Sequence, residues 1–576
     1  MASAYRGHVP TYPKDFTVTD QDAPAPAAPR RKPRRRTLLI AALIVVTLMV
    51  AATAVTLSFL GGSGTDQAPS PTESSPAASS PFQRPADWSP NRPAVHMTPE
   101  KNWMNDPQKP FLLDGVWHYY YLYNADHPDG NGTAWYHSTS TDLVHWEDQG
   151  IAIDKYTNGL GDIWTGTAVV DSENTAGFGA GAVIALVTQQ VDGVQRQSLF
   201  ASTDGGYSFE SYEGNPVMDN PGVADWRDPR VFWDENAGHW VMALAEHDRI
   251  GFYTSPNLRD WTYASDFVTA GLGVLECPDL FPMAVDGDPN NVRWVLLAGA
   301  NGAAEGMTTG TTYWVGDWDG TTFTADETGH QWLDHGADYY AAVTWDDTRL
   351  SAQERLNSRY SIAWMNNWAY AGDFPAGDWH GGSDSVVRSI RLGSDEDTEK
   401  LYSAPAEEMR SLEGEPEQID PLRLDSGSST ELRASASDAY RLTLDAAAAD
   451  GTGEVRVKVL SADGTFATVG YDFDTELAFV ARDTDAIASE MPAEYRAVRT
   501  APVPSKDGRV RLDIVVDVAS IEVFAGDGEA SITMATYGSP GARQLSVDAL
   551  RGAVEITDAR LTPLRVAPVV RESAAE

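Results

Sequence analysis

A strand pattern that recurs five times limits this chain to a small number of architectures. Five segments are apolar and rich in aromatic residues, as buried strands are, and their starts lie about 60 residues apart. That spacing leaves room for a four-stranded sheet with insertions in each repeat. The repeats therefore predict a five-bladed β-propeller within residues 88–415, with a large β-sandwich as the alternative. The segments span residues 116–124, 182–190, 239–247, 292–299 and 360–368.

A second strand, closed by a turn and an aromatic residue, follows most of these segments. Three such elements end at Trp146, Phe209 and Trp261, and a looser copy ends at Phe323. The Asp, Asn and Gly residues before those aromatic residues are the ones that tight turns between strands prefer. This recurrence favours the propeller, because each blade is a run of antiparallel hairpins.

The pattern changes in residues 422–566, where short strands with alternating apolar and polar residues follow one another. Such alternation is typical of strands with one buried face, and Asp527-Gly528 supplies a turn between two of them. No cluster of carboxylates or aromatic residues there suggests a reaction. We therefore predict a β-sandwich with a supporting or sugar-binding role, so that the folded chain as a whole is all-β.

The first 87 residues differ from the rest in composition. Residues 1–36 carry eight Lys and Arg against three Asp and Glu, and residues 37–60 form an uncharged apolar run. A run of that length can cross a bilayer as a single helix, with its basic flank in the cytoplasm. A cleaved signal peptide is the alternative, because Ala-Thr-Ala at residues 52–54 resembles a cleavage site. Residues 61–87, rich in Ser and Pro, predict a disordered stalk that holds the catalytic part outside the cell membrane.

The net charge of −41 argues against nucleic acid as a partner, because an acidic surface repels phosphate. It suits a neutral substrate instead. Cys277 is the only cysteine, so no intramolecular disulfide can form. We expect this side chain to be a packing residue, with a nucleophilic role as the alternative. No motif in the sequence calls for a cofactor or a metal ion, and we expect neither, nor an obligate protein partner.

Three acidic residues stand out by their position relative to the repeat. Asp106, Asp228 and Glu276 each precede one of the five strand segments by a short interval. The strand that comes first in a propeller blade lines the central channel, so all three carboxyls are predicted to converge there. Cleavage of a glycosidic bond requires such a group, because one carboxylic acid must protonate the leaving oxygen while a carboxylate captures or stabilises the sugar cation.

The sequences around these acids resemble glycoside hydrolase family 32, which contains invertases, inulinases and levanases. The motifs are Asn-Trp-Met-Asn-Asp-Pro at residues 102–107, Trp-Arg-Asp-Pro at 226–229 and Glu-Cys-Pro-Asp at 276–279. They occur in the family's order, and Trp-Thr-Gly-Thr at 164–167, Asp-Tyr-Tyr-Ala at 338–341 and Trp-Met-Asn-Asn-Trp at 364–368 agree with it. Residues 516–524 also look like the family's sandwich domain.

The resemblance implies a role for each acid. Asp106 would be the nucleophile at the anomeric carbon of a fructosyl unit, Glu276 the acid/base, and Asp228 the residue that stabilises the transition state through the sugar hydroxyls. It further implies a substrate-binding pocket with a fructan as the substrate. Residues expected to shape this pocket are Trp103, Asn105, Trp135, Trp164, Thr165, Arg227 and Tyr340.

Several positions depart from the common family pattern. Gln108 and Lys109 replace the usual Asn-Gly, and Leu122 stands where Gln is frequent. We expect these changes to alter the floor and rim of the pocket, which disfavours sucrose. Residues 98–103, 174–179 and 272–281 look closest to bacterial levanases of the levanbiose-producing or endo-acting type. The sequence therefore predicts a retaining levan hydrolase. Alternatives are a fructotransferase that forms a difructose anhydride, an exo-acting fructanase, inulinase or invertase, and a non-catalytic polysaccharide-binding surface protein.

Overall fold

The computed structural model describes most of the chain from residue 89 onward. The described residues are 89, 91–99, 101–327, 329–374, 379, 382–395, 398–435, 437, 439–460, 464–537 and 543–565. The predicted basic tail (1–36), membrane segment (37–60) and stalk (61–87) lie outside them. Among the described residues, no helix is both long and apolar enough to cross a membrane.

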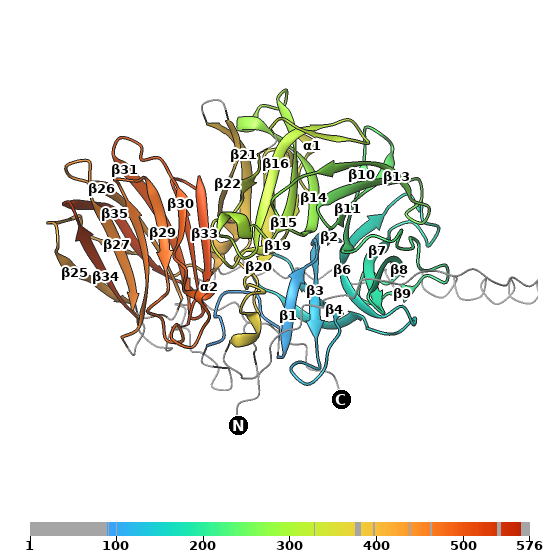
Figure 1. The fold of residues 1–576 in the computed structure, drawn as a ribbon, viewed down its shortest axis with the longest axis horizontal. Helices are drawn as coiled ribbons and strands as arrows, with labels where there is room; N and C mark the ends of the chain where they lie inside the picture. The colour runs from blue at the N-terminus through green and yellow to red at the C-terminus, as the bar shows by residue number, and fades with distance from the viewer. Residues whose placement is uncertain are drawn as a thin grey trace, which may run out of the picture. The chain divides into compact units, whose positions relative to one another are not determined.

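Five antiparallel sheets, each built from consecutive strands, form the N-terminal part of the described chain (Figure 1). The first sheet contains β1 (Trp103–Pro107), β2 (Phe111–Leu113), β3 (Val116–Asn124), β4 (Ala134–Ser140) and β5 (Glu147–Ile153). The second contains β6 (Asp162–Asp171), β7 (Ala182–Val191), β8 (Val194–Ser202) and β9 (Glu210–Ser211). The third contains β10 (Trp226–Asp234), β11 (His239–Glu246), β12 (Arg249–Ser255) and β13 (Thr262–Val268).

The fourth sheet contains β14 (Leu275–Ala284), β15 (Val292–Ala300), β16 (Gly310–Trp318), β17 (Phe323–Ala325) and β18 (Gln331–Trp332). The fifth contains β19 (Tyr340–Trp345), β20 (Arg359–Trp364), β21 (Arg388–Asp395) and β22 (Thr398–Pro405). In each sheet, the strand that pairs with the first strand is called the second strand here: β3, β7, β11, β15 and β20. Each of the five segments singled out in the sequence overlaps one of these second strands, so the predicted blades are confirmed.

The first strands of the sheets lie together at the centre of the propeller. β10 contacts β6 and β14, β14 contacts β19, and β19 contacts β1. The ring closes through β6, which contacts β3 and β4 of the first sheet. Side chains at the same height on these inner strands therefore meet at one end of the central channel.

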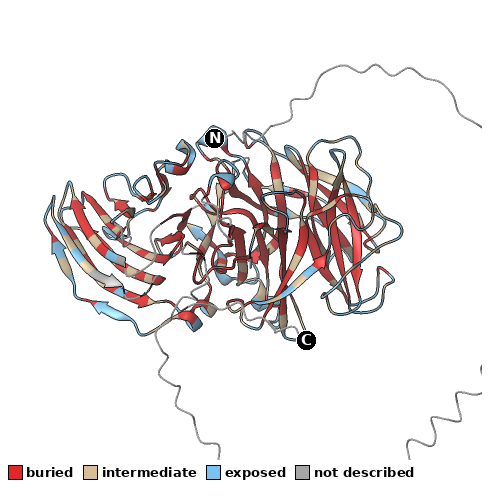
Figure 2. Cartoon of the chain, turned by 90° about the horizontal axis from the view of Figure 1, so that it is seen from below, coloured by how far each residue is buried: buried red, intermediate tan, exposed pale blue. Residues whose placement is uncertain are grey.

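The second strands have continuous apolar sequences because both of their faces are buried. On β11, Met242 and Leu244 pack with Leu186 of the preceding sheet, whereas Ala243 and Ala245 pack toward the following sheet. A strand covered on both sides loses the alternation of apolar and polar residues. In Figure 2 the strands within the propeller are coloured mostly as buried, whereas many connecting loops are exposed.

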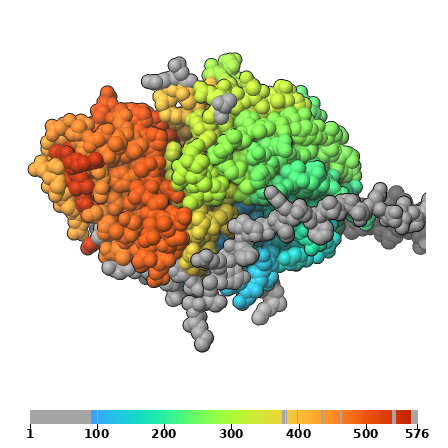
Figure 3. Space-filling view, viewed as in Figure 1, coloured from blue at the N-terminus to red at the C-terminus, as the bar shows by residue number. Residues whose placement is uncertain are grey.

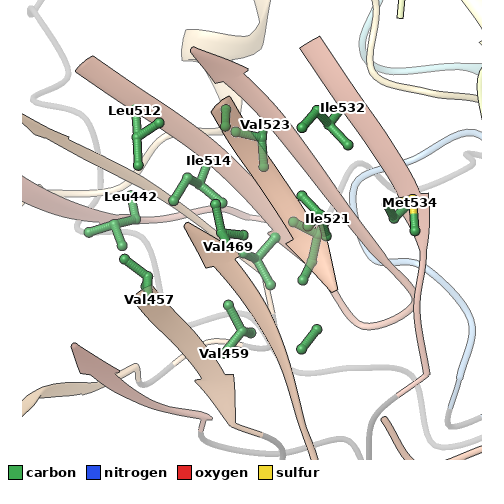
Figure 4. Close-up of a cluster of buried hydrophobic side chains, with 14 of the residues drawn as sticks. Leu442, Val457, Val459, Val469, Leu512, Ile514, Ile521, Val523, Ile532 and Met534 are labelled. Atoms are coloured by element: carbon green, nitrogen blue, oxygen red, sulfur yellow. The ribbon is translucent and has the colours of Figure 1, made fainter. Parts of the chain in front are cut away.

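A β-sandwich of two antiparallel sheets follows the propeller. One sheet contains β23 (Glu417–Ile419), β24 (Leu422–Leu424), β26 (Tyr440–Ala448), β31 (Arg509–Asp517), β32 (Ser520–Ala525), β33 (Ala530–Ala535) and β35 (Val554–Pro563). The other contains β25 (Ser429–Ser435), β27 (Glu454–Leu460), β28 (Phe466–Asp472), β29 (Leu477–Ala481), β30 (Arg499–Pro502) and β34 (Arg543–Leu550). Apolar side chains from both sheets, such as Val457 and Ile514, meet between them (Figure 4).

The helices of the described residues are single turns or short 3-10 segments. They are α1 (Ala352–Arg355), α2 (Ala493–Arg496), η1 (Val285–Gly287), η2 (Ala303–Glu305), η3 (Ala371–Asp373) and η4 (Glu407–Leu412). The all-β prediction is therefore confirmed for the described part of the chain.

Buried ion pairs join the sandwich to the propeller. Arg388 on β21 reaches Glu522 on β32 at 2.5 Å and Asp334 at 2.8 Å. His96, which precedes the first blade, lies between Asp517 at 2.8 Å and Glu522 at 2.9 Å. In Figure 3 the orange surface of the sandwich adjoins the yellow-green surface of the last blade. Because these charges are fully buried and paired, breaking one pair would leave an uncompensated charge in the interface.

Candidate active site

An irregularity occurs at the same place in every inner strand. Pairing with the second strand is interrupted after Asn105 on β1, Ile163 on β6, Arg227 on β10, Glu276 on β14 and Tyr340 on β19. A β-bulge of this kind bends the strand and redirects a side chain that would otherwise point into the sheet. The five bulges therefore turn residues from five blades toward a common space.

Asp106 sits at the bulge of β1 and is held by two side chains. The Thr165 hydroxyl on β6 donates to its Oδ2 at 2.5 Å, and the Asn105 amide donates to its Oδ1 at 3.0 Å. Trp103 in turn donates its indole N–H to Asn105 at 3.0 Å. These bonds fix the orientation of the Asp106 carboxyl, which remains partly exposed to the central space.

Asp228 occupies the corresponding place on β10 and is buried. Its backbone has a φ of 64°, in the left-handed region that non-glycine residues rarely adopt. The backbone N–H of Cys277 donates to its Oδ2 at 3.0 Å, so β14 is tied directly to this carboxyl. The Cys277 sulfur lies 3.6 Å from Asp228 Oδ2 and 3.8 Å from Asp106 Oδ2, which places these two carboxyls on either side of one thiol.

Glu276 precedes the bulge of β14 and accepts from two donors. Arg227 donates to its Oε1 from Nε at 3.1 Å and from Nη2 at 2.9 Å. The Tyr340 hydroxyl of β19 donates to its Oε2. Arg227 also donates to Asp225 at 2.6 Å, and this second carboxylate limits the movement of the guanidinium.

The electrostatics of the three acids are linked. Burial raises the pKa of Asp106, and the nearby Glu276 carboxylate adds to that effect against the bonds from Thr165 and Asn105. Burial also raises the pKa of Asp228 to about 7; the Arg227 guanidinium opposes this rise, and the Glu276 and Asp106 carboxylates add to it. The protonation of Asp228 is therefore coupled to the charges of its neighbours.

An aromatic surface adjoins Asp106. The Trp103 ring lies 5.9 Å from Trp364, 6.1 Å from Trp368 and 5.0 Å from His127, measured between ring centroids. Trp103 and Trp364 are buried, whereas Trp368 is 51% exposed although it stacks on both. A large exposed ring supported from below can hold the apolar face of a ligand.

Trp135 and Trp164, both predicted for the pocket, donate their indole N–H groups to partners other than the three acids. Trp135 is fully buried between the first two blades and donates its indole N–H to the Trp164 carbonyl at 3.0 Å, so it supports the strand beneath Thr165. Trp164 is partly exposed and donates to Asp162 at 2.9 Å. The remaining residues predicted for the pocket, Trp103, Asn105, Thr165, Arg227 and Tyr340, lie within the hydrogen-bond network of the three acids or directly beside it.

The positions that depart from the family pattern do not form the rim of the site. Gln108 is fully buried and bridges two inner strands, donating to the Asp106 carbonyl and accepting from the Gly166 N–H, each at 2.8 Å. Leu122 is buried in the core between the first two blades. Lys109 lies close enough to Arg230 and Arg359 that burial and these cations lower its pKa to about 7. Gln108 and Leu122 are therefore interior residues, and the effect of the three residues on the pocket and on sucrose stays a prediction.

Sequence reasoning missed several residues of this site. Asp225 and Cys277 hold Arg227 and Asp228, and Trp368 provides the exposed ring. Cys277 and Trp368 had a sequence signal, since they lie in the Glu-Cys-Pro-Asp and Trp-Met-Asn-Asn-Trp motifs, whereas Asp225 had none. Among the described residues, no group of three or more His, Cys, Asp or Glu side chains is arranged to hold a metal ion.

Comparison with known proteins assigns the family. The model of the glycosyl hydrolases family 32 N-terminal domain matches residues 96–405, and that of the family 32 C-terminal domain matches residues 408–563. The chain belongs to glycosyl hydrolase family 32. It is thus a glycoside hydrolase, and the resemblance found in the sequence is confirmed.

Within family 32, levanases are among the similar proteins. A levanbiose-producing levanase of Bacillus subtilis is 43% identical over 455 residues, covering 78% of this chain and 86% of that protein. A levanbiose-producing levanase of Geobacillus stearothermophilus is 51% identical over 310 residues, covering 53% of this chain and 78% of that protein. The crystal structure of an exo-inulinase from Aspergillus awamori superposes with a TM-score of 0.75 at 29% identity, covering 83% of this chain and 99% of that one.

Proposed function

We propose that this family 32 enzyme hydrolyses the β-2,6 linkages of levan and releases levanbiose or short levan oligosaccharides. The levanbiose-producing levanases at 43% and 51% identity support levan as the substrate. The observation that carries the proposal is the convergence of Asp106, Asp228 and Glu276 from three blades, linked through Cys277 and Arg227. A protein that only bound polysaccharide would have no need of three carboxyls held in this way.

The mechanism that this geometry supports is a double displacement. One Asp106 oxygen attacks C2 of the fructosyl unit while Glu276 gives a proton to the departing glycosidic oxygen. The resulting ester between Asp106 and the sugar is then attacked by water, from which Glu276 removes a proton. Water adds at C2, Asp106 leaves as a carboxylate, and the active site returns to its starting state.

The other residues have supporting roles in this proposal. Asp228 is buried against the site and would accept hydrogen bonds from fructosyl hydroxyls that tighten as positive charge develops on the sugar. Arg227 and Tyr340 hold Glu276 in position from opposite oxygens.

Product analysis tests the proposal. The full chain is incubated with levan, inulin and sucrose, and the products are separated by chromatography and identified by mass. Levanbiose or short levan oligosaccharides from levan are the expected result. A cyclic difructose anhydride would show a fructotransferase, free fructose alone would show exo-attack, and binding without any product would contradict an enzymatic role.

We also propose that the catalytic part works outside the cell, attached to the membrane or released from it. This rests on the apolar run at residues 37–60 and its basic flank. Fractionation of the producing cells, followed by protease treatment of intact cells, tests it. The enzyme should be accessible to protease on intact cells or be found in the medium, and a fully protected chain would refute the proposal.

A further inference from the structure

The sandwich carries an open groove on the outer face of its six-stranded sheet. The groove has a volume of about 560 Å³ and is lined by strands β27, β28, β29 and β30 with their connections. Strand alternation explains its location: Val457, Val469 and Val480 point into the sandwich core, so the residues between them face solvent. Nothing in the proposed catalytic chemistry uses these residues.

Small side chains form the floor of this groove. The cross-strand register places Thr468 of β28 between Lys458 of β27 and Ala481 of β29. The neighbouring row places Gly470 beside Phe479, and a Cβ atom on Gly470 would collide with the Phe479 ring. The ring therefore lies across the glycine and presents its other face outward.

Two aromatic rings border the floor and are held by cations. The Arg456 guanidinium lies 5.8 Å from the centroid of Phe479, and the Lys458 ammonium lies 5.4 Å from the centroid of Phe466. The cations are themselves anchored, Lys458 to Asp548 at 2.6 Å and Arg456 to Glu454. Both rings are half-buried and keep part of their surface free.

Polar groups between the rings are available for a ligand. Two threonines line the groove, Thr500 with an exposed side chain and Thr468 with a largely buried one. The charges of the lining nearly balance, with Glu454, Asp472 and Asp483 against Arg456 and Lys458. A polyanion or a polycation would gain little here, whereas a neutral chain with hydroxyls and apolar C–H faces matches both the rings and the threonines.

We propose that this groove is a second binding site for the fructan polymer, separate from the active site. The inference rests on the proposed function, because that function supplies a neutral polyhydroxylated chain as the ligand. A second site on the same chain raises the local concentration of polymer at the active site by multivalent attachment. This attachment would raise the apparent affinity for long fructan chains but not for short oligosaccharides, which cannot occupy both sites at once.

Affinity electrophoresis in gels that contain levan tests the groove. Full chains that carry Glu276→Gln, so that the polymer survives, are compared with and without Phe479→Ala. Loss of the ring should weaken retardation by levan about fivefold. Phe479→Leu, which preserves the apolar contact with Gly470 but lacks an aromatic face, should have a similar effect, and circular dichroism checks that both variants fold.

The matched control is Tyr263→Ala, which removes a 52% exposed aromatic ring from β13 of the propeller. It should leave retardation unchanged. Equal retardation of the Phe479 variants and their parent would overturn the second site. Turnover of a fructan trisaccharide by the otherwise unaltered chain reports the proposed function separately, so failure of the groove and failure of the function give different results.

Discussion

At the level of single residues, backbone strain and hydrogen bonding work together in the acid cluster. Asp228 and Cys277 both have positive φ values, 64° and 47°, at equivalent bulges of β10 and β14. Each such residue costs about 1–3 kcal/mol and persists only where the surroundings enforce it. Here the Cys277 N–H bonds the Asp228 carboxyl, so the two strained residues stabilise each other. The strain therefore serves to aim Asp228 at the channel.

Glu276→Gln tests the acid/base role. The amide keeps the shape of the side chain; its oxygen can still accept from Arg227 and its NH2 can donate to the Tyr340 hydroxyl, but it cannot exchange a proton. We expect kcat on levan to fall about 10³-fold, because proton transfer by a positioned group contributes 10²- to 10⁴-fold. The thermal midpoint should stay close to that of the unaltered chain. Glu407→Gln, the same change at a side chain that is 80% exposed, is the control, and near-normal turnover by Glu276→Gln would refute the assignment.

The Cys277 thiol is predicted to be unreactive in the folded protein. Burial and the adjacent Asp228 and Asp106 raise its pKa well above the usual range, so the thiolate that attacks alkylating reagents does not form. Iodoacetamide at pH 8 should leave the native chain unmodified and label the denatured chain, as measured by mass spectrometry. Cys277→Ala retains the backbone N–H that bonds Asp228 and should keep activity within about tenfold. Rapid labelling of the native chain, or complete loss of activity in Cys277→Ala, would revive a nucleophilic role for this residue.

At the level of secondary-structure elements, the sequence predicted the strands whose environment is uniform. The second strands of the blades are buried on both faces, so a simple apolar run marks them. The inner strands were recognised only through their motifs, because bulges and polar site residues interrupt their pattern. The contact of Cys277 with Asp228 depends on the alignment of separate blades, which local patterns cannot specify. Asp225 lies only two residues from Arg227, but no motif marked it.

Gln108 provides a test of the contact between inner strands. Its amide satisfies the Asp106 carbonyl and the Gly166 N–H, both in the interior. Gln108→Ala would leave these two groups without partners, at a cost of about 1–3 kcal/mol each. We expect a lower thermal midpoint together with reduced kcat, because Asp106 loses the bond that holds its backbone. Gln418→Ala, on the exposed edge strand β23, is the matched control and should change stability by less than about 0.5 kcal/mol.

At the level of the whole molecule, the sandwich and the propeller are joined by buried charges. The residues 516–524 that resemble the family's sandwich domain supply Asp517 and Glu522 to this interface. Arg388 and His96 meet them from the propeller side, hundreds of residues away in the chain. Buried pairs of this kind add little net stability compared with apolar packing, but they tolerate few alternative arrangements of the two parts.

His96 gives this interface a predicted pH dependence. Burial lowers its pKa, but the bonds and charges of Asp517 and Glu522 outweigh burial and raise it from 6.5 to about 9. Because the folded pKa lies above the unfolded one, the stabilisation is complete below pH 6.5 and is lost as pH rises through 9. The shift corresponds to about 3 kcal/mol.

Thermal midpoints of the unaltered chain and of His96→Gln, measured from pH 6 to pH 10, test this expectation. The variant should be less stable at pH 6, and the difference between the two curves should shrink toward pH 10. Asp384 also titrates in this range, since burial raises its pKa to about 8, and its stabilising protonated form is lost as pH rises. Subtracting the two curves does not fully remove that contribution, because the His96 charge lowers the Asp384 pKa. The same comparison is therefore made with Asp384→Asn in both backgrounds, where only His96 differs. A difference that stays constant from pH 6 to pH 10 would mean that His96 is not protonated between its two carboxylates.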